Sequence, residues 1–314
     1  MKNIIKAFLP SFMKNFIFRF YIILLGIIPK YISSQKFWSR NVVDAPNNGF
    51  SNIESSLKHL NWRNNQYIDF LKNMPMNKYR SKVVLDFGCG PGNDLINIGI
   101  LSKPKRIIGV DVSNKAIQLA KKRTSLHNIN VDFYKINENQ KMFQIPNKSI
   151  DVIQSNGVLH HINDLNIVFK EFTRVLKDDG IIKVMVYNKN SIWFHLHVAY
   201  EIKVKKALWK TMKTSEIFSK TTDGFDCPVS KCYSTDEFIQ MCKENYFEAK
   251  LSGISISVFE MTKINLIWEA LKSKSLEKES SDFLKKIEYN KKGLPIVNEK
   301  IAGINSYFEL TKLK

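Results

Sequence analysis

The chain has 314 residues, 44% of them hydrophobic, and a formal net charge of +19. These values allow one large buried core and exclude an intrinsically disordered protein. Lysine supplies 41 of the 48 basic residues and arginine 7, whereas proteins that read nucleic acid favour the bidentate guanidinium of arginine. The charge is therefore attributed first to biased composition and second to an anionic membrane surface. Nucleic acid is the partner that it favours least.

Residues 1–48 form an apolar, basic N-terminal extension. Its longest stretch with a single charge, residues 16–28, would span about 20 Å as a helix, less than the roughly 30 Å hydrocarbon core of a bilayer. No small-residue cleavage site of a signal peptide follows it. Two interpretations remain open: a basic amphipathic helix that lies on a membrane, or a helix that covers the substrate pocket or packs on the domain.

Four cysteines stand at positions 89, 227, 232 and 242. None forms a CxxC pair, so the spacing of a zinc site is absent. We expect free thiols, a cytoplasmic setting and no metal site. The sequence leaves the oligomeric state open.

Apolar side chains recur at helical spacing in residues 51–73, which predicts a helix. From residue 82 to 188, short apolar runs alternate with helical stretches. Strands are predicted at 83–87, 106–112, 131–136, 150–155 and 181–187, and helices at 93–101, 114–127 and 165–176. Because the strands are almost continuously apolar, they predict a parallel sheet buried on both faces, as in a doubly wound α/β domain.

After residue 188 this alternation breaks. Residues 191–220 predict a basic helical insertion and 221–234 a loop. A helix at 235–244, a strand at 247–252, a helix at 264–288 and a strand at 306–313 follow. We therefore expect a core over residues 49–262, with an acceptor-side insertion at about 191–234, and a C-terminal part, 263–314, whose last strand completes the sheet.

The strongest motif is a glycine-rich turn directly after the first predicted strand. Gly88, Gly90 and Gly92 are spaced GxGxG and let the backbone approach a ligand closely. A dinucleotide fingerprint would need its third glycine at position 93, which is Asn93. Asp86, at the end of the strand, would repel a pyrophosphate. It suits a ligand with an ammonium group and a sulfonium, such as S-adenosylmethionine.

A second acid, Asp111, ends the second predicted strand, 19 residues after Gly92. An acid at this place can accept hydrogen bonds from both hydroxyls of a ribose. The combination of Asp86, the GxGxG turn and Asp111 predicts a nucleoside-type cofactor at the carboxyl edge of the sheet.

Residues 82–188 resemble the core of the class I S-adenosylmethionine-dependent methyltransferases, in particular the small-molecule group related to ubiquinone biosynthesis. Besides the turn and the ribose acid, three stretches carry the resemblance: 146–153 (PNKSIDVI), 156–161 (NGVLHH) and 177–181 (KDDGI). The resemblance implies a mostly parallel, seven-stranded, doubly wound sheet of the Rossmann-like methyltransferase fold. It also implies S-adenosylmethionine as cofactor and in-line methyl transfer to a small-molecule or lipid-like acceptor.

The same resemblance implies roles for individual residues. The backbone of the turn would hold the methionine end of the cofactor, Asp86 would lie near its amino group and Asp111 would bind the ribose. Counting back from Asp151 places Asn139 and Gln140 at the adenine, with Asn137 and Glu138 as alternatives. Asn156 would flank the reacting end. The implied cofactor-binding set is Asp86, Gly88, Cys89, Gly90, Gly92, Asp111, Asn139, Gln140 and Asn156.

Candidates for a general base are His160 and His161, which follow the fourth predicted strand. Each could instead pack in the core or cap the next helix, and Tyr187 is a weaker candidate. His195 and His197 are two residues apart, which places them on different faces of a helix and makes them poor joint metal ligands. The stretch 222–234 resembles one in bacterial methyltransferases of unassigned acceptor, and we expect it to be acceptor-side structure without chemistry of its own.

The lysines of the insertion, at 203, 205, 206, 210 and 213, could meet phosphates or lipid headgroups, or simply form a solvated helix face. With the N-terminal extension they suggest a lipid or lipid-linked acceptor. Three other functions stay open: a nicotinamide-dependent oxidoreductase on the same fold, a nucleic-acid methyltransferase, and a binding module without catalysis.

Overall fold

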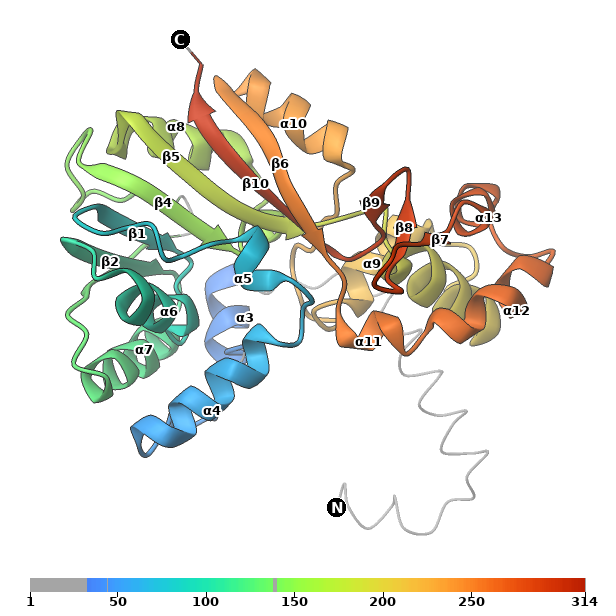
Figure 1. Cartoon of the computed structure of the whole chain (residues 1–314), viewed down its shortest axis with the longest axis horizontal. Coiled ribbons are helices and arrows are strands. Elements are labelled where there is room, and N and C mark those ends of the chain that lie inside the picture. The colour runs from blue at the N-terminus through green and yellow to red at the C-terminus, as the bar shows by residue number, and fades with distance from the viewer. Residues whose placement is uncertain (1–32, 44, 138–139, 314) are drawn as a thin grey trace.

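The computed structural model describes residues 33–43, 45–137 and 140–313. Its centre is a seven-stranded sheet in the order β3-β2-β1-β4-β5-β10-β6 (Figure 1). The strands are β1 (Val83–Phe87), β2 (Arg106–Asp111), β3 (Asp132–Lys135), β4 (Ile150–Asn156), β5 (Leu176–Tyr187), β6 (Phe247–Ser255) and β10 (Asn305–Lys312). The first five are parallel to one another, and β10 runs antiparallel to β5 and β6. The predicted doubly wound, mostly parallel, seven-stranded sheet is confirmed.

The strand order reverses between β1 and β4. From β1 the chain passes through α6 (Asn93–Ser102) to β2 and through α7 (Asn114–Leu126) to β3, and then returns to the other side of β1 with β4. Side chains at this switch point meet at the carboxyl ends of the strands, where open α/β sheets bind ligands. The GxGxG turn joins β1 to α6 and therefore lies at this place.

Alternate side chains of the strands enter two separate layers of core. Leu85 and Phe87 pack on the face covered by α8 (Leu165–Val175) and α10 (Thr235–Glu244). Val84 packs on the opposite face, which is covered by α5 (Phe70–Asn73), α6 and α7. Burial on both faces explains why the strands read as continuous apolar runs.

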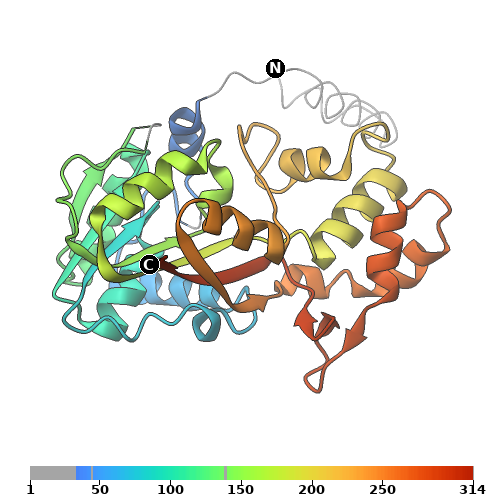
Figure 2. The ribbon, with the colours of Figure 1, turned by 90° about the horizontal axis from the view of Figure 1, so that it is seen from above.

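A second lobe lies beyond the carboxyl end of β5 (Figures 1 and 2). Its elements are η2 (Trp193–Lys205, wound as a π-helix), α9 (Thr214–Thr221), α11 (Val258–Met261), η3 (Ile264–Leu266), α12 (Ile267–Lys272), α13 (Lys278–Lys285), β7 (Glu288–Tyr289), β8 (Pro295–Val297) and β9 (Lys300–Ile301). The predicted single helix at 264–288 is wrong: η3 continues directly into α12, residues 273–277 separate α12 from α13, and the strands β7–β9 follow. The insertion and the C-terminal part share one apolar core, which includes Leu196, Tyr200, Ala270 and Leu284.

The insertion lysines are partly neutralised within this lobe. The ammonium of Lys203 pairs with Glu277, that of Lys205 with Glu269 at 2.8 Å, and that of Lys206 with Glu201 at 3.0 Å. These three lysines are therefore engaged in ion pairs, which weakens the prediction that they meet phosphates or lipid headgroups.

The predicted helix at 51–73 is divided into α4 (Ile53–Asn64) and α5, because Asp69 between them has a left-handed backbone, with φ at 61°. Ahead of it lies α3 (Ser34–Arg40), capped by the side chain of Ser33. The predicted N-terminal membrane helix lies mostly in residues 1–32, outside the described residues. Within residues 33–43, 45–137 and 140–313, no helix has both the length and the apolar character needed to cross a bilayer.

Candidate active site

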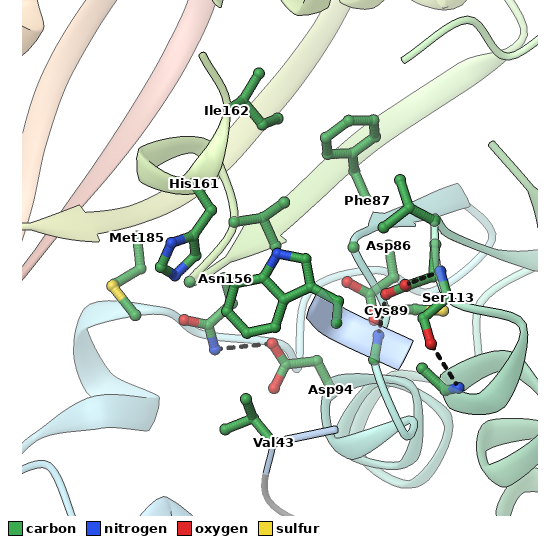
Figure 3. Close-up of a pocket in the computed structure, with 18 of the residues that line it drawn as sticks. Val43, Asp86, Phe87, Cys89, Asp94, Ser113, Asn156, His161, Ile162 and Met185 are labelled. Atoms are coloured by element: carbon green, nitrogen blue, oxygen red, sulfur yellow. Dashed lines mark hydrogen bonds between the residues drawn. The ribbon is translucent and has the colours of Figure 1, made fainter. Parts of the chain in front are cut away.

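A cavity of about 440 Å³ opens at the carboxyl ends of β1, β2 and β4 (Figure 3). Its walls come from the GxGxG turn, the ends of these strands, α3, α4 and the loop that contains Asp223. This volume is within the range of small-molecule sites, roughly 300–1,000 Å³. One cavity thus collects side chains from both ends of the chain.

The glycine turn is held against β2. The backbone N–H groups of Gly88 and Cys89 donate to the carbonyl of Val110, at 2.8 and 2.9 Å. Gly88 has φ at 78°, and a Cβ there would lie 2.3 Å from Cγ2 of Val158. Gly88, Cys89 and Gly90 line the cavity, so their backbone is exposed to a ligand as expected.

Gly92 departs from its predicted role. It is not among the described residues that line the cavity. It begins α6 with φ at 87°, and a Cβ would lie 3.3 Å from the Cβ of Ala120 on α7. Its place therefore serves the close packing of α6 on α7 rather than contact with a cofactor.

Asp111 is buried and lines the cavity. Its Oδ1 accepts from the backbone N–H of Ser113 at 2.8 Å, and its Oδ2 accepts from that of Gly90 at 2.9 Å. Burial raises the pKa of Asp111, and these backbone hydrogen bonds oppose the shift. A carboxylate has further lone pairs, so a fixed Asp111 can still accept hydroxyl groups from the cavity.

Asp86 lies across the turn and is 2% exposed. Burial raises the pKa of its carboxyl well above the ordinary value, the Asp94 carboxylate raises it further, and the Arg63 guanidinium opposes the shift. In the described part of the chain its Oδ2 has no hydrogen-bond partner. Buried polar atoms are normally satisfied, so the site fits a ligand that brings a donor such as an ammonium group to Asp86.

Two residues missing from the sequence-based prediction stand beside Asp86. Oδ1 of Asp94 accepts from Nη1 of Arg63 at 2.8 Å, and its Oδ2 accepts from Nδ2 of Asn156 at 2.9 Å (Figure 3). Asn156 lines the cavity as predicted, and its Oδ1 is buried with no partner in the described residues. Arg63 is on α4, outside every motif, and no spacing in the sequence pointed to it.

Another part of the cavity wall is more apolar than the part around Asp86 and Asp94. Val112, Ala116 and Ile136 form it together with Gln140, which is buried. This arrangement suits a purine and keeps Gln140 as a candidate for its polar edge. Asn139 and Glu138 lie outside the described residues. The remaining alternative, Asn137, is exposed and does not line the cavity.

The structure separates the two histidines. His161 lines the cavity, whereas His160 is fully buried and is not part of the wall. The ring of His160 stacks on Tyr187 with centroids 3.7 Å apart, and its Nδ1 accepts from the backbone N–H of Tyr187 at 3.3 Å. Burial lowers its pKa well below the ordinary value. His160 therefore packs β4 against β5 and has no contact with the cavity from which it could act as a base.

His161 has a defined orientation. Its Nδ1 lies 2.8 Å from the carbonyl of Val229, so this nitrogen carries a proton and donates it. Its Nε2 lies 3.8 Å from Oδ1 of Asp223. Burial lowers the pKa of His161, while the Asp223 carboxylate and the hydrogen bond to Val229 oppose the shift. The ring is consequently neutral at pH 7, with the lone pair on Nε2.

Asp223 belongs to the 222–234 stretch, which was expected to be acceptor-side structure without chemistry of its own. It lines the cavity and accepts hydrogen bonds from the hydroxyls of Tyr187, at 2.9 Å, and Ser230, at 2.6 Å. Burial raises the pKa of Tyr187 well above its ordinary value, and Asp223 adds to the shift, so this phenol keeps its proton. The loop therefore supplies a carboxylate next to His161.

Atoms of His161, Asp223 and Cys227 lie within 4.8 Å of one another, which is close enough for a metal ion. Two of the donor atoms already have a partner, since Nδ1 of His161 and Sγ of Cys227 both donate to the carbonyl of Val229. Burial raises the pKa of Cys227 to about 12, whereas metals bind the thiolate. The absence of a metal remains a prediction, tested below.

The indole of Trp38 completes this end of the cavity. Trp38 is on α3 and lines the cavity, and its ring centroid is 4.7 Å from that of His161. Within the described part of the N-terminal extension, α3 and residues 41–43 line the cavity, and the interpretation that the extension covers the pocket remains a prediction.

The fold and the site together define a methyltransferase with a nucleoside cofactor. Residues 78–274 match the model of a family described as a methyltransferase domain, and the chain belongs to this family, the class I S-adenosylmethionine-dependent methyltransferases. S-adenosylmethionine is the cofactor of the class, and Asp86, Asp111 and the glycine turn fit it.

Curated relatives agree with this assignment. A ubiquinone biosynthesis O-methyltransferase of Pelagibacter ubique is 31% identical over 111 residues, which are 34% of this chain and 42% of that protein. A malonyl-[acyl-carrier protein] O-methyltransferase of a Marinomonas species is 29% identical over 51% of this chain and 63% of its own length. The matches thus span less than two thirds of either relative.

Solved structures share the fold. Haemonchus contortus phosphoethanolamine N-methyltransferase 2, in complex with phosphomonomethylethanolamine and S-adenosylhomocysteine, superposes with a TM-score of 0.51. It is 14% identical, with 91% of this chain and 62% of that chain covered. At this identity the likeness concerns the fold alone.

Proposed function

We propose that this protein transfers the methyl group of S-adenosylmethionine to a small-molecule acceptor that binds at the His161 end of the cavity. The observation that carries the proposal is that one cavity is lined both by the glycine turn with its two acids and by His161 and Asp223. A cofactor at the first end and an acceptor at the second would therefore share one enclosed space.

The bound cofactor would supply an electrophilic methyl group on a sulfonium, and the protein contributes position and a dry environment. Asp111 would accept hydrogen bonds from the ribose hydroxyls. Asp86 and Asp94 would face the ammonium of the methionine end, and Arg63 would face its carboxylate. Gln140 would meet the adenine.

His161 would act as the general base. Its neutral ring presents the lone pair of Nε2, and a proton accepted there creates an imidazolium 3.8 Å from the Asp223 carboxylate. The carboxylate stabilises that charge, as in other histidine–carboxylate pairs. Asp223 is in turn held by Tyr187 and Ser230.

The earlier alternatives fare differently. The family assignment replaces the nicotinamide-dependent oxidoreductase. No contact among the described residues favours a nucleic-acid substrate. A lipid-linked acceptor and an anionic membrane surface depend on residues 1–32 and on the exposed Lys210 and Lys213, because the insertion lysines at 203, 205 and 206 are ion-paired.

Two measurements test the proposal. Titration calorimetry should show saturable binding of S-adenosylmethionine and none of NAD or NADP. Incubation with methyl-labelled cofactor and fractionated cell extract should then label a small molecule, and His161→Ala should abolish the labelling while cofactor binding persists. Binding without transfer to any fraction would support the non-catalytic module instead.

A further inference from the structure

We propose that the acceptor is an amine, which binds as its ammonium ion between aromatic rings and the Asp223 carboxylate. The inference rests on the proposed function and narrows the chemistry of the acceptor. It starts from the charges that surround the cavity.

The cavity is acidic although the chain carries a net charge of +19. Among the described residues its wall contains five aspartates and one arginine, Arg63, which is ion-paired to Asp94. The aspartates are Asp86, Asp94, Asp111, Asp164 and Asp223. Such a wall attracts cations and repels phosphates and carboxylates.

Cofactor binding uses only part of this charge. S-adenosylmethionine has a sulfonium, an ammonium and one carboxylate, hence a net charge of +1. Asp86, Asp94 and Asp111 stand around the glycine turn, whereas Asp223 stands beside His161. The acceptor end therefore keeps a carboxylate that has no lysine or arginine against it in the described part of the wall.

Aromatic rings line the same end. Trp38, Tyr67 and Tyr187 are in the cavity wall, and the Trp38 ring packs against His161. The faces of such rings attract ammonium groups, most strongly when the groups are desolvated. Asp223 is 14% exposed at its side chain and has lone pairs beyond the two used by Tyr187 and Ser230.

The charges that develop during methyl transfer differ between an amine acceptor and a hydroxyl acceptor. An entering ammonium ion gives a proton to Nε2 of His161 and becomes an amine with a free electron pair. That nitrogen bonds to the methyl carbon as the sulfur–carbon bond breaks and the sulfur keeps the bonding pair. One positive charge thereby moves from sulfur to nitrogen, and the methylated ammonium remains next to Asp223 and the rings.

A hydroxyl acceptor would develop negative charge at the same place. An oxyanion beside Asp223 would be repelled. Arg63 is paired with Asp94, so the cation left for the oxyanion in the described wall is the imidazolium that His161 forms, whose charge Asp223 already neutralises. An amine is therefore the acceptor class that this end of the cavity stabilises both before and after transfer.

The test uses the full chain saturated with S-adenosylhomocysteine, whose binding is measured first. Choline is then compared with its uncharged isostere, 3,3-dimethylbutan-1-ol, and tetramethylammonium and phenyltrimethylammonium serve as smaller and larger cations. We expect a cation to bind at least about tenfold more tightly than the isostere, as a desolvated cation–π contact implies. Saturation-transfer NMR and calorimetry both report this binding without turnover.

Substitutions test which residues produce the preference for the cation over its isostere. Asp223→Asn and Trp38→Leu should each abolish the preference for the cation, while Asp223→Glu should retain part of it. Asp226→Asn, in the same loop, and Trp62→Leu, on the outer side of α4, do not line the cavity and serve as matched controls. Thermal melting identifies variants that fail to fold. If Asp223→Asn fails to fold, the comparison of Asp223→Glu with the unmodified chain decides whether the carboxylate produces the preference for the cation.

The outcomes are distinct. Failure of S-adenosylhomocysteine to bind overturns the proposed function and this inference with it. If the cofactor product binds but no cation is preferred over the isostere, the amine acceptor alone is overturned. Preferential binding of an anionic probe such as 4-hydroxybenzoate would indicate a hydroxyl or carboxyl acceptor and would also overturn it.

Discussion

The side-chain amide of Asn156 donates a hydrogen bond to Oδ2 of Asp94 at 2.9 Å (Figure 3). This contact joins the end of β4 to the first turn of α6, and Arg63 holds the other oxygen of the same carboxylate. The cofactor end is therefore fixed by side chains from three elements. Asp94→Asn would leave the half-buried guanidinium of Arg63 without this charge, so we expect weaker cofactor binding and a lower melting temperature, both measurable on the purified variant.

The size of the effect of Asp94→Asn can be estimated from the energy of a hydrogen bond to a charged group. Losing a hydrogen bond to a charged group costs about 1.5–3 kcal/mol. A melting temperature and a cofactor affinity that both match those of the unmodified chain would contradict this account of Asp94. Glu54→Gln, at an exposed position on α4, is a suitable control for removal of an acidic charge.

Asp111→Ala should weaken binding of S-adenosylmethionine by about 1.5–3 kcal/mol, because it removes a carboxylate that the ribose hydroxyls would share. Calorimetry measures the change. Asp132→Ala, on the neighbouring strand β3 and exposed, should leave the affinity unchanged. Equal affinities of the Asp111 variant and the unmodified chain would show that the ribose binds elsewhere.

Gly88→Ala tests the close approach at the turn. Both Gly88 and Gly293 have positive φ, 78° and 73°, but only at Gly88 would a Cβ collide with a side chain, Val158 at 2.3 Å. The left-handed backbone alone costs about 1–2 kcal/mol. We expect Gly293→Ala to lose about that much stability and Gly88→Ala to lose more, measured by urea denaturation.

The double change Gly88→Ala with Val158→Ala separates collision from backbone strain. It should recover part of the loss relative to Gly88→Ala. If the two single glycine variants are equally stable, the collision is relieved by small shifts and the tight packing has no energetic role.

Stability should fall in mild acid through His195. Burial lowers the pKa of His195 from 6.5 to about 3, and its Nδ1 lies 3.0 Å from Oγ of Ser280. Between these values the unfolded chain binds a proton that the folded chain resists, so the unfolding free energy decreases as pH falls through this window. Linkage gives roughly 2 kcal/mol for this one group between pH 7 and 5.

Replacing His195 isolates its contribution to the pH dependence of stability. His195→Asn should lower stability at pH 7 through lost packing on Phe283, but its stability should change less between pH 7 and pH 5. Urea denaturation at both values gives the two differences. An unchanged pH dependence would show that His195 is protonated in the folded state.

Chelation tests the predicted absence of a metal. Because Nδ1 of His161, Sγ of Cys227 and the Asp223 carboxylate are all hydrogen-bonded, we expect EDTA to leave cofactor binding and methyl transfer unchanged. Cys227→Ser should also retain transfer. Loss of activity with EDTA, restored by a divalent cation, would establish a metal at this cluster.

The parts of the fold that repeat a simple pattern were predictable. The bounds of β1 agree with the predicted strand because buried parallel strands are continuously apolar. Ser113 caps α7 through the N–H of Ala116 as its side-chain chemistry favours. A helix was predicted where η2 lies, but its π-helical winding and the small sheet β7–β9 were not, because their apolar residues become one core only when distant segments meet.

The same division applies to the site. Asp86, Asp111 and the turn were found because their spacing along the chain fixes their spacing in the sheet. Arg63, Trp38 and Asp223 could not be found that way, since each reaches the cavity through the packing of a separate segment. Sequence spacing could not tell which of His160 and His161 reaches the cavity, because neighbouring side chains on a single tight turn point in different directions.

The position of β10 has a consequence for folding during synthesis on the ribosome. This strand enters between β5 and β6, and its first residue, Asn305, lines the cavity. The strands that carry the glycine turn emerge roughly two hundred residues earlier, and domains can begin to fold during synthesis. The sheet can therefore close between β5 and β6 only after β10 has been synthesised, and only then does the pocket gain the part of its wall that Asn305 provides.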